Sequence, residues 1–144
     1  MRSTLWWAAL PALALASATC GDDAVDPQTL LGTWDATAMQ FTSVANPQDQ
    51  VDAIDVGGAF VITLAANNMC QATLTLPGEP PENLTGTWSA SADVFTLQWT
   101  GEMFETQFDF VSSGNTLFLT GGHVNFDFGG GDEEATLDVT LVRR

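Results

Sequence analysis

The side chains able to act as nucleophile, general acid or base are few and scattered. His123 is the only histidine, and the serines lie mostly in turn-like sequence with no nucleophile-elbow motif around them. A Ser-His-Asp arrangement would have to use His123, whose alternating neighbours predict an exposed strand position. Glu102 and Glu105 are close in sequence, but nothing around them predicts a shared cleft. We therefore predict no catalytic residues and expect that the protein is not an enzyme.

The strongest candidate for a metal site is the acidic segment 125–134, which reads NFDFGGGDEE. Its Asn, Asp and Glu side chains offer oxygen ligands, and calcium takes six to eight of them. The spacing does not match a calcium loop, so we favour a solvated hairpin tip. One histidine and one core cysteine are too few for zinc. We predict no metal and no cofactor, with loose cation binding as the alternative.

The first 19 residues have the layout of a secretory signal. Arg2 provides a positive start, and an apolar stretch of about a dozen residues from Leu5 to Ala16 precedes small residues. Such a stretch is too short to span a bilayer comfortably. We expect an exported protein whose mature part begins near residue 20.

Cys20 is the candidate lipidation site. It is followed by Gly21 and an acidic linker, an arrangement that resembles bacterial lipoproteins, in which the thiol is acylated and becomes the mature N-terminus. The chain departs from their usual motif at Ser17 and Thr19, and an ordinary cleavage after Ala18 is the alternative. The resemblance implies a lipid anchor in the cell envelope, because acyl chains supply about 0.8 kcal/mol per buried CH₂.

Cys70 is the only other cysteine. It shares its alternation with Leu74 and Leu76, so we expect a thiol buried in the core. Without acylation, Cys20 and Cys70 could instead form a disulfide in a soluble, secreted or periplasmic protein.

The charge is strongly acidic. The 18 acidic residues all lie beyond residue 20, against Arg2, Arg143 and Arg144 as the only basic residues. Such a surface repels the phosphates of nucleic acids and anionic lipid headgroups. We predict no nucleic-acid partner and a membrane contact only through Cys20; a partner protein, if any, is not identified by the sequence.

From Leu30 onward, apolar and polar side chains alternate with period two between turn residues, which predicts antiparallel strands with one face buried. The first strand places Trp34, Ala36, Ala38 and Gln40 on one face; segment 45–55 has no clear pattern. We expect an all-β protein with a signal (1–19), a polar tether (20–29) and an up-and-down barrel of about eight strands (30–144).

Two Gly-Thr-Trp motifs carry a family resemblance. Gly32-Thr33-Trp34 opens the first strand, and Gly86-Thr87-Trp88 opens a middle one. With the hairpins around 93–97 and 114–119 and a last strand ending on arginine, the chain resembles the lipocalin-like β-barrel domains of bacterial exported proteins. That resemblance covers residues 30–144 and implies a barrel that holds a small apolar molecule.

Arg143 continues the apolar face of the last strand after Leu137, Val139 and Leu141. It could therefore reach the end of the barrel and stack on Trp34, a cation–π contact worth about 0.5–2 kcal/mol within about 6 Å. The lipocalin resemblance implies the same structural role.

The predicted function is a cell-envelope, lipocalin-like lipoprotein that binds a small hydrophobic ligand in the barrel. The alternative is a non-catalytic envelope interaction module with a filled core and an acidic surface. A cavity of roughly 300 Å³ or more favours the ligand. The predicted lining consists of inward-facing residues from several strands: Trp34, Phe60, Ile62, Leu74, Trp88, Leu97, Trp99, Phe108 and Phe126.

Overall fold

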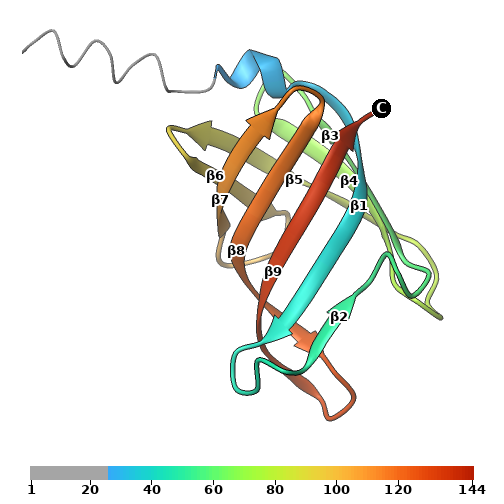
Figure 1. Ribbon diagram of the computed structural model, residues 1–144. Helices are drawn as coiled ribbons and strands as arrows, with labels where there is room; N and C mark the ends of the chain where they lie inside the picture. The colour runs from blue at the N-terminus through green and yellow to red at the C-terminus, as the bar shows by residue number, and fades with distance from the viewer. Residues whose placement is uncertain (1–25) are drawn as a thin grey trace, which may run out of the picture.

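The computed structural model describes residues 26–144, which form one short 3₁₀ helix and nine antiparallel strands (Figure 1). Their bounds are η2 Pro27–Leu30, β1 Gly32–Ser43, β2 Gln50–Asp52, β3 Ala59–Leu64, β4 Met69–Thr75, β5 Glu82–Ser91, β6 Val94–Trp99, β7 Thr106–Ser113, β8 Thr116–Asp127 and β9 Asp132–Arg143. The signal segment, Cys20 and most of the predicted tether lie outside the described residues.

Eight of the strands close into a barrel. Each strand from β3 to β8 pairs with the next along the chain, and β1 pairs with both β3 and β9. The remaining strand, β2, pairs with Gln40–Thr42 at the far end of β1. The predicted all-β antiparallel barrel is confirmed, and closure removes the exposed sheet edges that an open sheet would leave.

The inward faces follow the period-two pattern of the sequence. In β3, Phe60, Ile62 and Leu64 are buried, and in β6 the same holds for Phe95 and Leu97. Burying side chains of this size contributes about 1.5–3 kcal/mol each relative to leaving them in water. The single apolar interior therefore accounts for most of the stability of the barrel.

The first strand departs from the predicted alternation. A β-bulge shifts the register between Ala36 and Ala38, so residues beyond it change faces. The expectation that Ala38 and Gln40 share the face of Trp34 is therefore wrong, and Met39 and Phe41 point inward instead. An extra residue in one strand turns every later side chain to the opposite side of the sheet.

A second bulge bends β8 near its middle. Gly121 has a positive φ of 76°, and its N–H donates to Asp138 Oδ1 at 2.8 Å. The next residue, Gly122, touches the ring of Phe108 so closely that an added Cβ would lie 2.2 Å from Phe108 Cε1. Glycine at 122 thus lets the Phe108 ring occupy the inside of the wall.

The patternless segment 45–55 is a loop that contains β2 and a run of turns. Asp52 organises it, because its Oδ1 accepts the N–H groups of Ile54 at 2.9 Å and Met39 at 3.1 Å. Within residues 26–144, no helix has the length and apolar character needed to cross a bilayer.

Candidate functional site

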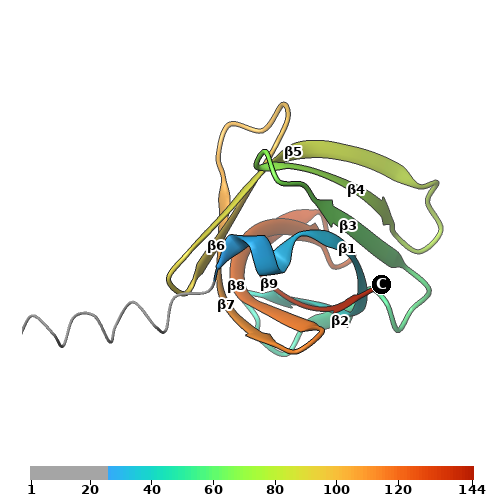
Figure 2. The ribbon, with the colours of Figure 1, turned by 90° about the horizontal axis from the view of Figure 1, so that it is seen from above.

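One end of the barrel is sealed by η2, which lies across the ring of strands in Figure 2. The Asp26 side chain caps the helix by accepting the N–H of Gln28. Leu30 is fully buried, and its carbonyl accepts the indole N–H of Trp34 at 2.9 Å. Trp34 is also fully buried, so its ring closes this end of the interior.

Arg143 holds this seal in place. Its guanidinium carbon lies 4.3 Å from the centroid of the Trp34 ring, so the predicted cation–π contact is present. The same group donates to the carbonyl oxygens of Leu31 and Thr29. The predicted start of the barrel domain, residue 30, is the last residue of η2.

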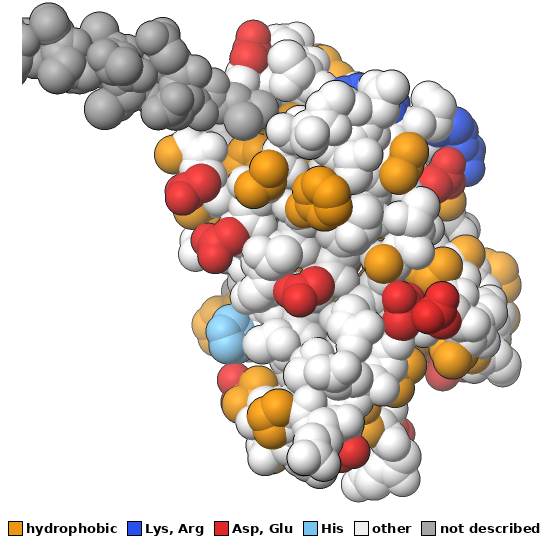
Figure 3. All heavy atoms as spheres, viewed as in Figure 1, with side chains coloured by type: hydrophobic (Ala, Val, Ile, Leu, Met, Phe, Trp, Pro, Cys, Tyr) orange, Lys and Arg blue, Asp and Glu red, His pale blue; other side chains and the backbone are white. Residues whose placement is uncertain are grey.

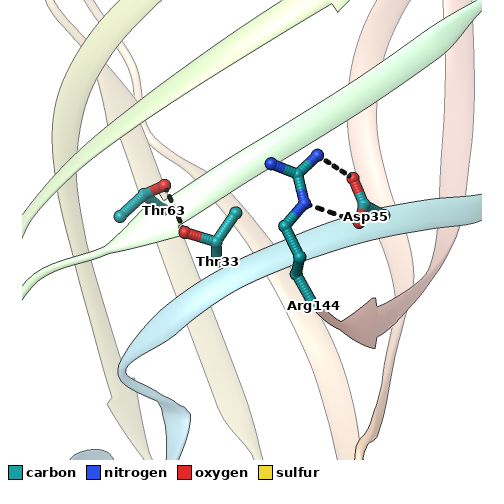
Figure 4. A network of polar contacts seen from close by, with 4 residues as sticks. All are labelled: Thr33, Asp35, Thr63 and Arg144. Atoms are coloured by element: carbon teal, nitrogen blue, oxygen red, sulfur yellow. Dashed lines mark hydrogen bonds and ion pairs between the residues drawn. The ribbon is translucent and has the colours of Figure 1, made fainter.

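The neighbouring Arg144 lies on the outside, as its polar alternation predicts. Its guanidinium donates two hydrogen bonds to the Asp35 carboxylate, at 2.8 and 3.1 Å (Figure 4). This pairing raises the pKa of Arg144 further. Thr33 and Thr63 share a hydroxyl hydrogen bond across β1 and β3 beside it. Both arginines of the described chain are thus committed at the sealed end.

The other half of the barrel is hollow. It encloses a cavity of about 230 Å³. The lining is apolar apart from two residues, and it comes from every strand of the barrel: Met39, Phe41, Phe60, Ile62, Leu74, Leu76, Leu84, Phe95, Leu97, Trp99, Thr106, Phe108, Leu119, Val124, Asn125, Phe126, Leu137, Val139 and Leu141.

The two polar lining residues mark the mouth of the cavity. Thr106 is the first residue of β7, and Asn125, which is exposed, lies near the end of β8. The hydrogen-bonded register of these neighbouring strands begins at Asp109 and Thr120. The start of β7 (106–108) and the part of β8 after Thr120 are not paired with each other. The barrel wall is therefore open between Thr106 and Asn125.

Seven of the nine residues predicted to line a ligand site do line this cavity: Phe60, Ile62, Leu74, Leu97, Trp99, Phe108 and Phe126. Trp34 and Trp88 do not. Trp34 belongs to the seal, whereas Trp88 donates its indole N–H to the Ala65 carbonyl at 3.0 Å and stacks on Phe95. Alternation predicts the face of a side chain but not its height along the barrel, so it does not distinguish these two residues from the cavity lining.

Several lining residues were missed by the sequence prediction. Leu137, Val139 and Leu141 share one alternating run in the last strand, so their inward direction was readable from the sequence. The inward direction of Met39 and Phe41 could not be predicted in this way, because the β1 bulge reverses the alternation before them. Phe41 stacks on Phe126 with ring centroids 4.0 Å apart and so forms part of the cavity wall.

The size of the cavity falls between the two cases considered from the sequence. It is below the roughly 300 Å³ that favours an ordinary ligand pocket, yet the interior is not filled. At about 30 Å³ for a group the size of water, the space takes about eight such groups.

The acidic segment 125–134 forms the β8–β9 hairpin. Asp127 Oδ1 accepts the N–H groups of Gly129 at 2.7 Å and Gly131 at 3.0 Å, and these bonds lower the pKa of Asp127. His123 is exposed and lies 3.5 Å from Glu134. Among residues 26–144, no three His, Cys, Asp or Glu side chains are close enough to hold a metal ion.

Cys70 is buried, as its alternation predicts, with 2% of its surface exposed. Burial raises the pKa of its thiol to about 11. A neutral, enclosed thiol is a poor nucleophile, so this side chain acts as a small apolar group of the core.

Comparison with protein-family models finds no match to the sequence, and comparison with curated proteins finds none either. The closed eight-stranded antiparallel barrel is compatible with a lipocalin-like fold.

Proposed function

We propose that this protein is a lipocalin-like, non-enzymatic binding protein that takes a small aliphatic molecule into the hollow half of its barrel. The cavity of about 230 Å³ with nearly all-apolar walls carries the proposal. Burying eight methylenes yields about 0.8 kcal/mol each, and the cost of association takes back much of that sum. The expected affinity is therefore weak, with a Kd of about 0.1–1 mM.

The proposal includes a cellular location. Cys20, with the signal-like residues before it, is the proposed site of a lipid anchor that keeps the barrel at the cell envelope. An acidic barrel would not adhere to anionic lipids by itself, so attachment to a membrane would need such an anchor. Mass spectrometry of the mature protein tests the anchor; a linked 20–70 peptide would contradict it.

Titration calorimetry with straight-chain alcohols from hexanol to decanol tests the binding function. Affinity should rise with each added methylene up to about eight carbons and then level off, because longer chains leave the cavity. Leu74→Trp, which adds a ring inside the cavity, should abolish binding. Val111→Trp is the matched control, because Val111 is exposed on the outer face of β7. Equal affinity in both variants, or no dependence on chain length, would refute the proposal.

A second candidate function is an envelope interaction module, and the loop between β6 and β7 favours it. Met103 and Phe104 are adjacent there, with 84% and 80% of their surfaces exposed. Large exposed apolar side chains at a loop tip suit contact with another protein. This candidate predicts that Met103→Ser/Phe104→Ser would abolish a cross-link to an envelope protein while leaving octanol affinity unchanged. An unchanged cross-link would exclude it.

A further inference from the structure

The basic groups of the described residues lie at one end of the barrel, whereas acidic groups lie at both ends. Both arginines of the described chain lie at the sealed end, where Arg143 is held by the seal and Arg144 by Asp35. In Figure 3 the blue basic atoms gather at the upper end, while red acidic atoms are spread over the face from end to end. Among residues 26–144, no lysine or arginine therefore lies at the open half of the barrel to meet an anion.

Carboxylates flank the mouth of the cavity. Glu105 directly precedes Thr106 at the mouth, and Glu133, which is half-buried, is the cross-strand partner of Phe126 in the cavity wall. Asp127 and Glu134 share the exposed face of Asn125 and point away from the interior. We call Glu105 and Glu133 the mouth carboxylates.

A third carboxylate also lies on the cavity side of the wall. Glu82 is the register partner of Leu74 and lies two residues before Leu84, and both leucines line the cavity. Residues two apart on a strand, and residues directly opposite on paired strands, share one face of the sheet. Glu82 therefore belongs on the inner face at the edge of the hollow half.

From this placement we propose that the cavity selects aliphatic molecules with a positively charged end group and rejects those that end in a carboxylate. This inference rests on the proposed function, since the apolar cavity must first hold the alkyl chain. The chain supplies the affinity, and the end group, left at the mouth, meets the field of the mouth carboxylates and Glu82. An amphiphile with a quaternary ammonium or amine end is the expected class, and a fatty acid is the excluded one.

The test compares three probes with the same octyl chain: octyltrimethylammonium, 1-octanol and octanoate. Calorimetry at low ionic strength should give the ammonium probe at least about tenfold higher affinity than octanoate, with octanol in between. The gap should shrink in 0.5 M NaCl, because salt screens exposed charges over a few ångströms. Octanoate binding as tightly as the ammonium probe would overturn the inference.

Two charge-reversal variants test which part of the protein produces the preference for the ammonium probe over octanoate. Glu105→Lys should narrow the gap between the ammonium probe and octanoate by roughly fivefold. Asp93→Lys makes the same charge change at the β5–β6 turn, at the sealed end, and should leave the gap unchanged. Equal effects of both variants would mean that net charge, not the mouth, sets the preference, and would overturn the inference.

Octanol separates this inference from the function on which it depends. If octanol binds and the charged probes do not differ, the cavity function stands and the charge selection is wrong. If none of the three probes binds, the cavity function itself fails. Correct folding of both variants is checked by near-UV circular dichroism before titration.

Discussion

The two halves of this barrel are built from the same alternating strands but end differently. In the sealed half, Leu30 and Trp34 are fully buried and Arg143 joins the last strand to the backbone ahead of the first. In the hollow half, Trp99 and Leu74 remain partly exposed around an unfilled space. Alternation alone therefore closes the wall but does not fill the interior; a helix and an arginine are needed to complete one end.

Removing the central ring of the seal should have the largest effect on stability. Trp34→Ala is expected to lower the free energy of unfolding by about 3–5 kcal/mol, because a fully buried ring is lost and its cavity cannot collapse. Trp99→Ala, in the hollow half, should cost less, about 1–2 kcal/mol, since Trp99 already borders empty space. Urea unfolding of both variants measures the difference; equal losses would contradict the comparison of the two halves.

Removing Arg143, which holds the seal, should have the next largest effect on stability. Arg143→Gln removes the cation–π contact and two charged hydrogen bonds to backbone carbonyls, with an expected loss of about 2–4 kcal/mol. Arg144→Gln is the matched control, and it should leave the urea midpoint unchanged because its ion pair is exposed. A larger loss for the control would show that the surface pair, not the seal, joins the chain ends.

Gly122 tests how tightly the wall of the hollow half is packed. Gly122→Ala puts a Cβ about 2.2 Å from the Phe108 ring, which must move, and the expected cost is about 1–3 kcal/mol. Gly130→Ala in the β8–β9 hairpin meets no atom within 4 Å and should change stability by less than about 0.5 kcal/mol. Because the displaced ring would enter the cavity, octanol affinity should also fall in Gly122→Ala alone. An unchanged midpoint would mean that Phe108 is free to move.

The smallest effect concerns Cys70 and depends on pH. The pKa of the folded thiol is raised to about 11, above that of an unfolded cysteine near 9, so the unfolded state loses its proton first as pH rises. The stability contributed by the neutral thiol is complete below about pH 8 and declines between about pH 9 and 11. Relative to Cys70→Ala, the native protein should lose about 1 kcal/mol by pH 10. A constant difference over this range would show that the thiol is not desolvated.

Much of the fold was predictable because a two-residue period leaves little choice of structure. Runs such as Phe60–Leu64 and Leu137–Leu141 alternate cleanly, so the faces of β3 and β9 followed from the sequence. The β1 bulge was not predictable, because nothing in the residue types around Ala36 and Ala38 marks the inserted residue. One undetected residue was enough to misplace the rest of that strand.

The sequence predicts which side chains of the candidate site point inward, but not how far along the barrel axis each one lies. Trp34 and Trp88 point inward as expected, yet the stagger between neighbouring strands puts them outside the cavity. The position of the cavity mouth could not be predicted from the sequence for a related reason. Thr106 and Asn125 come together only because the β7–β8 register starts beyond them, and no local sequence signal records that register.

Xenon binding followed by NMR of ¹³C-labelled methyl groups tests the central claim most directly, because xenon enters dry apolar cavities without needing polar contacts. The account predicts shifts that grow with xenon pressure at the methyls of Leu74, Leu84 and Val139, and none at those of Leu30 and Leu64 near the seal. Shifts at the sealed end, or at neither end, would contradict a barrel that is closed in one half and hollow in the other.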